Sequence, residues 1–297
     1  MYEAHFGLTE LPFGITPDTS FAFACASHQE ALNTLLVAVR NGEGFIKITG
    51  EVGTGKTLLC RRFLATLGPG FVSAYIPNPY LEPRALLLAL ADELRVAVEQ
   101  DADQYHLLKQ VTAALLQFAR DGKSVVLCLD EVQAMPLETL ESLRLLTNLE
   151  TEKRKLLQVV LFGQPELDLR LAQDSVRQLR QRIAFQYRLG ALRGRELDYY
   201  LEHRLRVAGH RGNRVFGPAT ASVLARHSNG VPRLVNILAH KAMLLAYGEG
   251  AQQVRPRHVK MAAADTPAAV AGIPRWRWFA YALLAVLACS LAWIAPR

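Results

Sequence analysis

The sequence predicts an α/β fold, a P-loop parallel sheet flanked by helices, followed by a smaller helical domain. Three observations predict it. Apolar runs alternate with helical patterns up to about residue 191. One of these runs, residues 44–49, leads into a glycine-rich loop and then into a helical pattern. From Gly194 onward the apolar spacing is helical throughout, and glycines fall at the expected helix ends.

The glycine-rich loop carries the strongest signal for function. It fits the pattern G-x-x-x-x-G-K-[ST] at each fixed position and consists of Gly50, Glu51, Val52, Gly53, Thr54, Gly55, Lys56 and Thr57. Glycines let backbone N–H groups converge on phosphate oxygens. We expect Lys56 to reach the β- and γ-phosphates of ATP and the Thr57 hydroxyl to bind Mg²⁺. The alternative is a tight glycine turn beside a surface lysine.

A second motif places two adjacent carboxylates, Asp130 and Glu131, at the end of the apolar run 124–129. Open α/β sheets bind ligands at the carboxyl ends of their strands. We therefore expect Asp130 to enter the Mg²⁺ shell and Glu131 to polarise the attacking water. Strand ends are often acidic, but the position of this pair, several elements after Lys56, makes the pattern specific.

Other polar residues lie where they could act on the nucleotide. Gln164 follows the next expected strand and could sense the γ-phosphate, although a turn-forming Gly-Gln-Pro is the alternative. One arginine before the last strand, Arg182 in preference to Arg180 or Arg177, could enter a neighbouring subunit's site; a solvated helix arginine is the commoner use. Arg233 opens a helix, where a cation opposes the dipole unless a phosphate compensates.

The amino-acid composition says less than these motifs about the class of protein. The net charge of +7 permits nucleic acid or an anionic membrane surface as a partner, but the arginines are scattered and a general basic surface fits equally well. The four cysteines have no C-x-x-C spacing, which predicts reduced residues and neither disulfides nor a zinc site. The N-terminus has no basic region leading into an apolar run, so no signal peptide is predicted.

The C-terminal residues predict one transmembrane helix. Residues 278–295 are uncharged and almost wholly apolar, and such a helix spans roughly 27 Å. Arg275 and Arg277 precede it and only Arg297 follows, which predicts a single-pass protein whose residues before the helix stay in the cytoplasm. A buried hydrophobic tail helix is the alternative.

The expected domains follow from these patterns. They are an N-terminal arm (1–25), a P-loop α/β domain (26–191), a helical lid (192–265), a linker (266–277) and the membrane helix (278–295). Ser27 and Glu30 have the spacing of a capping box at the start of a helix. The aromatic residues Tyr2 and Phe13 of the arm are expected to flank the adenine base.

Together these motifs resemble AAA+ ATPases and, more narrowly, the general secretion pathway protein A family. The resemblance spans residues 1–265, and beyond the motifs above it rests on Phe6-Gly7-Leu8, Pro12-Phe13, Thr16-Pro17-Asp18, His28-x-Glu30-Ala31, Leu161-Phe162-Gly163-Gln164-Pro165, Gln181-Arg182-Ile183 and Gly230-Val231-Pro232-Arg233-Leu234-Val235-Asn236. It implies ATP and Mg²⁺ as cofactors, a homo-oligomer, and inner-membrane secretion or pilus assembly proteins as partners. With the expected membrane helix it implies a single-pass bacterial inner-membrane location, with the ATPase domain cytoplasmic and a very short periplasmic tail.

The sequence therefore predicts a membrane-anchored AAA+ ATPase that hydrolyses ATP to drive assembly of a type IV (MSHA-like) pilus or a type II secretion machine. Two alternatives stay open. One is a DNA-dependent ATPase of the transposition or replication type, which the expected membrane helix disfavours, so nucleic acid is not an expected partner. The other is a nucleotide switch with negligible turnover.

Overall fold

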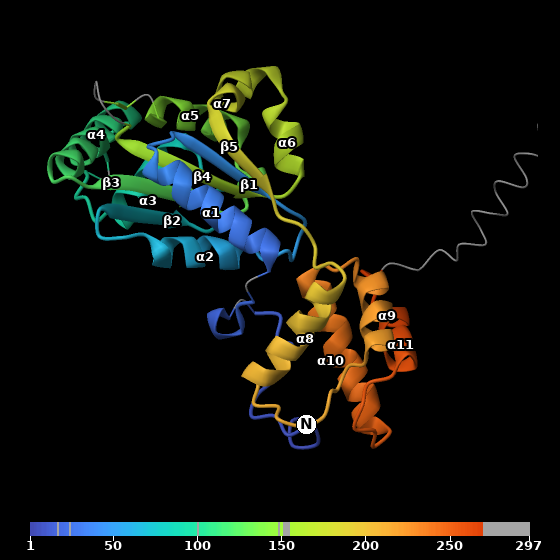
Figure 1. Cartoon of the computed structure of the whole chain (residues 1–297). Coiled ribbons are helices and arrows are strands. Elements are labelled where there is room, and N and C mark those ends of the chain that lie inside the picture. Colours follow the sequence, from blue (N-terminus) through green and yellow to red (C-terminus); the bar gives the residue numbers. More distant parts are fainter. Residues whose placement is uncertain (17, 24, 100, 148, 151–154, 270–297) are drawn as a thin grey trace, which may run out of the picture.

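The computed structural model describes residues 1–269 apart from 17, 24, 100, 148 and 151–154. Figure 1 shows a sheet covered by helices on both faces and, below it, a bundle of helices. The sheet has five parallel strands in the order β2-β3-β4-β1-β5. The strands are β1 (Phe45–Thr49), β2 (Phe71–Ile76), β3 (Ser124–Leu129), β4 (Leu157–Gly163) and β5 (Ile183–Arg188). The predicted parallel α/β fold is confirmed.

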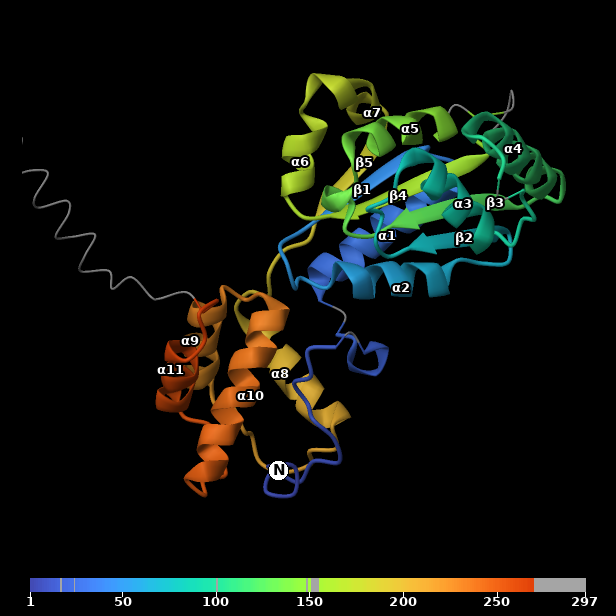
Figure 2. The same cartoon turned by 180° about the vertical axis from the view of Figure 1, so that it is seen from behind.

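The two faces of the sheet are covered by different helices, as Figures 1 and 2 show from opposite sides. The helices of this part are α1 (Ala26–Arg40), α2 (Lys56–Thr66), α3 (Pro83–Glu93), α4 (Gln104–Arg120), α5 (Leu137–Thr147), α6 (Glu166–Leu171) and α7 (Arg177–Gln181). Alternate residues of the central strands pack against α1 and α2 on one face and against α3 to α7 on the other. Both faces are covered, so the central strands β1, β3 and β4 are buried along almost their whole length and are mostly apolar.

Two local predictions are wrong. The apolar spacing from about Leu167 to Leu179 predicts a single helix, but the structure divides it into α6 and α7 by a 3₁₀ turn at Asp174–Val176, where Asp and Ser compete with helical hydrogen bonds. The capping box is not formed either. Cys25 is the N-cap residue of α1, and the Ser27 hydroxyl instead accepts the backbone N–H of Gly190, at 2.8 Å.

The helical lid contains α8 (Arg195–Val207), α9 (Pro218–Ser228), α10 (Pro232–Gly248) and α11 (Pro256–Ala264). Its core includes apolar side chains of the N-terminal arm, among them Tyr2, Phe6 and Phe13, which are all buried. In Figure 1 the blue arm runs along the lid beneath the sheet. The arm is therefore packed as part of the lid.

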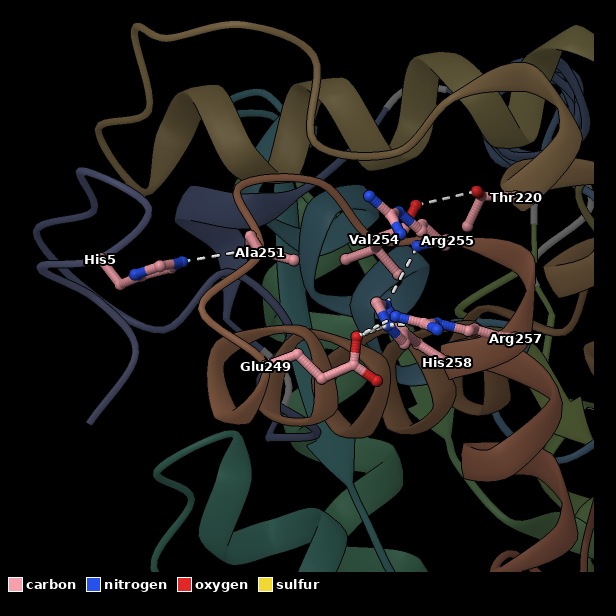
Figure 3. A network of polar contacts seen from close by, with 8 residues as sticks. All are labelled: His5, Thr220, Glu249, Ala251, Val254, Arg255, Arg257 and His258. Atoms are coloured by element: carbon pink, nitrogen blue, oxygen red, sulfur yellow. Dashed lines mark hydrogen bonds and ion pairs between the residues drawn. The ribbon is translucent and has the colours of Figure 1, made fainter.

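Polar contacts also fix the far end of the lid (Figure 3). His5 of the arm contacts the carbonyl of Ala251 through Nε2 at 3.0 Å. His258 is fully buried; its Nδ1 accepts the backbone N–H of Arg255 at 3.1 Å, and its Nε2 lies 3.0 Å from a Glu249 oxygen. These contacts join the arm, the loop after α10 and the start of α11.

The predicted transmembrane helix requires a correction. Among the described residues no helix is long and apolar enough to cross a membrane. The longest, α4 and α10, have 17 residues and pack one face into the protein cores, whereas a bilayer span needs about 20 apolar residues. The predicted span, 278–295, lies outside the described residues. The membrane-spanning fold and the single-pass inner-membrane location are therefore withdrawn.

Candidate nucleotide site

A cleft of about 210 Å³ lies between the glycine-rich loop, the arm and the lid. It is lined by Gly14, Ile15, Thr16, Asp18, Val52, Gly53, Gly55, Lys56, Thr57, Leu58, Glu131, Tyr200, Arg204, Pro232, Arg233 and Asn236. A larger cavity of about 370 Å³ beside α8 is less suited to a nucleotide. There Arg214 is already paired with Asp198 and Glu202, and no phosphate-binding loop contributes to the lining.

The loop follows β1 and turns sharply into α2, as the sequence predicts. Gly53 and Gly55 have φ values of +81° and +93°, which favour glycine. A Cβ on Gly53 would lie 2.4 Å from the Cβ of Arg233, so only glycine lets the lid approach this closely. The Lys56 ammonium donates to the carbonyls of Gly50 and Glu51, at 2.9 and 3.2 Å. The loop is thus folded around its lysine.

The side chains proposed to hold Mg²⁺ come together. The Thr57 hydroxyl donates to Oδ2 of Asp130 at 2.6 Å, although the two residues come from different elements. Among the described residues no group of three or more His, Cys, Asp or Glu could hold a metal ion. A hydroxyl and one carboxylate fit Mg²⁺, which is usually bound by one or two carboxylates together with substrate phosphates and water.

Burial changes the electrostatics of the two charged groups at the loop. It lowers the pKa of Lys56, which Glu131 and Asp130 partly offset. It also raises the pKa of Asp130, which the Thr57 hydroxyl partly offsets. The lowered pKa of Lys56 and the raised pKa of Asp130 both mean that the surroundings do not fully compensate the charge of the side chain. A nucleotide phosphate beside Lys56 and a cation beside Asp130 would each supply the opposite charge.

Glu131 is held in an unusual backbone conformation, with φ +53°, which non-glycine residues adopt rarely. Such strain concentrates at functional sites. Its Oε2 accepts from the amides of Gln164 and Gln133, at 2.9 and 2.5 Å. Gln133 in turn accepts the backbone N–H of Gln164 at 2.9 Å. Gln133 was not predicted from the sequence; its only signal is its place two residues after the acidic pair.

The structure places Arg233 in the cleft and Arg182 away from it. Arg233 begins the first turn of α10, and its backbone N–H donates to the Gly53 carbonyl at 3.2 Å. Arg182 precedes β5, whose first residue pairs with the first residue of β1. Since the loop follows the other end of β1, Arg182 lies roughly 20 Å from it at about 3.3 Å per residue. Arg182 therefore cannot act on the site of its own chain.

The part of the cleft that the N-terminal arm lines differs from the prediction. Tyr2 and Phe13 do not line it. Tyr2 is buried, and its hydroxyl lies 2.8 Å from Nδ1 of His240. Phe13 is buried with its ring against that of Phe216. They are drawn into the lid core because aromatic side chains gain most from full burial. The arm contributes a later segment to the cleft, which includes Ile15 and its 58% exposed side chain.

A buried guanidinium anchors that segment of the arm. Arg204 of α8 donates to the carbonyls of Pro12 and Gly14, at 2.5 and 3.5 Å, and lies 4.7 Å from the centre of the Phe21 ring. Asn236 of α10 also donates to Gly14, at 3.1 Å. One side chain thus holds both ends of the segment that borders the cleft. The sequence carries no local signal for this contact.

Arg204→Met is therefore expected to lower the free energy of unfolding by about 2 kcal/mol, because it leaves the buried Pro12 carbonyl without its donor, whereas Gly14 keeps the bond from Asn236. Chemical denaturation measures the effect. Arg206→Met is the matched control, since Arg206 is exposed on the same helix, and we expect it to change stability by less than about 0.5 kcal/mol. Equal stability of the two variants would contradict the anchoring role.

Comparison with known proteins agrees with this geometry. A family model described as an AAA domain matches residues 39–171. The chain is 41% identical over 263 residues to general secretion pathway protein A of Aeromonas hydrophila, which covers 89% of this chain and 48% of that protein. The chain is a member of the general secretion pathway protein A family of AAA+ proteins. It spans about half the length of this curated family member.

Solved structures show the same fold at low identity. The Aeropyrum pernix ORC2 protein in its ADPNP and ADP complexes matches with a TM-score of 0.60 and 18% identity, over 89% of this chain and 74% of that chain. Cdc6p of Pyrobaculum aerophilum matches with a TM-score of 0.62 and 18% identity, over 84% of this chain and 70% of that chain. The RuvB motor of Thermotoga maritima matches with a TM-score of 0.55 and 16% identity, over 82% of this chain and 72% of that chain. For this family member they establish the fold alone.

Proposed function

We propose that this protein binds ATP with Mg²⁺ in the cleft and hydrolyses it. The observation that supports this most directly is the hydrogen bond between Thr57 and Asp130 beside the buried Lys56. It joins the hydroxyl and the carboxylate that a magnesium nucleotide needs, at the mouth of a loop whose glycines face the same cleft.

The residues then have separate tasks. Lys56 and Arg233 supply positive charge to the phosphates, from the loop and from the lid. Bound Mg²⁺ would supply further charge neutralisation for the β- and γ-phosphates. Glu131 orients and polarises the attacking water, and the two amides on its Oε2 hold the carboxylate in place. Gln164, which bonds to that carboxylate, is the side chain we propose to sense the γ-phosphate.

Hydrolysis is completed by a second copy of the chain in this proposal. Arg182 lies at the amino end of the edge strand β5, whereas its own loop lies at the opposite, carboxyl end of the strands. An arginine at an exposed edge can reach only the site of a neighbour. We therefore propose that the protein oligomerises when ATP is bound, and that Arg182 acts across the subunit contact.

A mixing experiment tests this arrangement. Arg182→Ala should bind ATP but release phosphate at least 100-fold more slowly than the natural protein. Lys56→Ala should be inactive because it cannot bind ATP. A mixture of the two variants should regain phosphate release, since Lys56→Ala subunits offer an intact Arg182 to the intact sites of Arg182→Ala subunits. A mixture that stays as inactive as its components contradicts the proposal, and Arg206→Ala serves as the control for arginine loss.

We propose further that ATP turnover drives the assembly of a type II secretion machine or a type IV pilus. The support is the family itself, whose curated member is named for the general secretion pathway. A strain whose only copy carries Lys56→Ala should lose secretion or surface pili, as measured by export assays and electron microscopy. Normal secretion and piliation in that strain would contradict this role.

A DNA-dependent ATPase is a second candidate, because an Aeropyrum pernix ORC1 protein of the same fold, at 21% identity, was solved in complex with DNA. Salt-dependent DNA binding that stimulates phosphate release would favour it. A nucleotide switch is the third candidate. It would bind nucleotide yet release almost no phosphate over an hour.

A further inference from the structure

His28 contacts the glycine-rich loop from the side opposite the cleft. It lies on the first turn of α1, and its Nε2 is 2.7 Å from the carbonyl oxygen of Thr54. Its ring also covers Gly55, where a Cβ would lie 2.8 Å from the ring carbon Cε1. His28 is not among the residues that line the cleft. It therefore touches the loop without any place in the chemistry described above.

The protonation state of the ring follows from its surroundings. Burial lowers the pKa of His28, so the ring is neutral at pH 7. A neutral imidazole carries one N–H, and the Thr54 carbonyl can only accept. The proton is therefore on Nε2, and His28 donates a hydrogen bond to the loop.

This hydrogen bond fixes the orientation of one peptide unit. The peptide between Thr54 and Gly55 is planar and trans, so its N–H points away from its C=O. With the carbonyl directed at His28, the Gly55 N–H is directed to the other side, where Gly53, Gly55 and Lys56 line the cleft. Within the described residues this N–H donates to no other group. It is available to a phosphate oxygen.

The turn that carries His28 is itself held in place by its two preceding residues. The Ala26 N–H donates to the Glu196 carboxylate of α8 at 2.9 Å. The Ser27 hydroxyl accepts the Gly190 N–H, in the segment that connects β5 to the lid. Three consecutive residues thus contact the lid, its connecting segment and the glycine-rich loop. Such anchoring keeps the imidazole in one position relative to the loop.

We propose that His28 is a positioning residue that holds the Thr54 carbonyl and so directs the Gly55 N–H at a nucleotide phosphate. This inference rests on the proposed function, since it needs a phosphate in the cleft. It adds to that function a residue that lies outside the cleft, because His28 contacts the loop and not the nucleotide.

The test compares His28→Gln with His28→Asn. A Gln amide N–H reaches about as far as Nε2 of histidine, whereas the Asn amide is one carbon shorter. We expect His28→Asn to weaken Mg-ADP and inorganic tripolyphosphate binding by the same factor, about tenfold, as one lost hydrogen bond to a charged group implies. His28→Gln should stay within about threefold of the natural protein. Calorimetry of the full chain measures both ligands.

Ser27→Ala is the matched control, because it removes one anchor of the same turn but keeps His28 and the Ala26 bond to Glu196, which still holds the turn. It should change the tripolyphosphate affinity by less than about twofold. Equal affinity in all variants, or an equal loss in Ser27→Ala and His28→Asn, overturns the inference while the proposed function stands. An Asn variant that weakens ADP but not tripolyphosphate also overturns it. A natural protein that binds neither ligand overturns both.

Discussion

Lys56→Ala is expected to weaken the binding of Mg-ATP at least 100-fold. The Lys56 ammonium is buried at the loop and lines the cleft, where low local polarity strengthens its attraction to a phosphate that enters the cleft. Loss of a charged hydrogen-bond donor at such a site costs several kcal/mol in binding, and each 1.4 kcal/mol is tenfold. Fluorescent-nucleotide titration measures the change.

The control for this variant is Lys123→Ala. Lys123 is exposed in the turn before β3, at the amino end of the strands and far from the loop. It should bind Mg-ATP with unchanged affinity and have the same melting temperature as the natural protein. If Lys56→Ala retains the natural affinity while it is fully folded, the glycine-rich loop is not the phosphate site.

Glu131→Gln is expected to bind Mg-ATP with near-natural affinity but to release phosphate 100- to 10,000-fold more slowly, the range that general-base catalysis contributes. A glutamine has the same shape but cannot polarise water as a carboxylate does. Its neighbours Gln133 and Gln164 can still bond to its amide oxygen, so the local structure should survive. Single-turnover phosphate release, after binding is measured separately, isolates the chemical step.

Gln133→Ala refines this prediction, because it removes one of the two amides that hold the Glu131 carboxylate. We expect a smaller loss of turnover than in Glu131→Gln. The opposite ranking, with Glu131→Gln as active as the natural protein, would mean that another group activates the water.

The local motifs were sufficient to predict which residues come together around the glycine-rich loop. The loop around Lys56 has a fixed spacing, and a parallel sheet brings the carboxyl ends of its strands to one edge. For that reason Asp130 could be expected beside Thr57, and the structure has them in contact. The order of strands and helices followed from apolar periodicity, because the strands buried on both faces are mostly apolar.

Contacts that depend on tertiary structure could not be predicted in this way. Ser27 and Glu30 have capping-box spacing, yet Ser27 bonds to Gly190 and Glu30 to Tyr187, because the sheet and the lid connection bring better partners. Arg204 supports the arm through carbonyls, which have no side-chain signature. The membrane helix was inferred from composition alone, and no described helix has that character.

Calorimetric titration of the folded protein with Mg-ADP and with a slowly hydrolysed Mg-ATP analogue most directly tests whether the cleft is a nucleotide site. Saturable heat is predicted for both ligands, with one site per chain, and it should vanish for Lys56→Ala. If the natural protein, shown to be folded by circular dichroism, gives no saturable heat with either nucleotide at micromolar to millimolar concentration, the assignment of the cleft is contradicted.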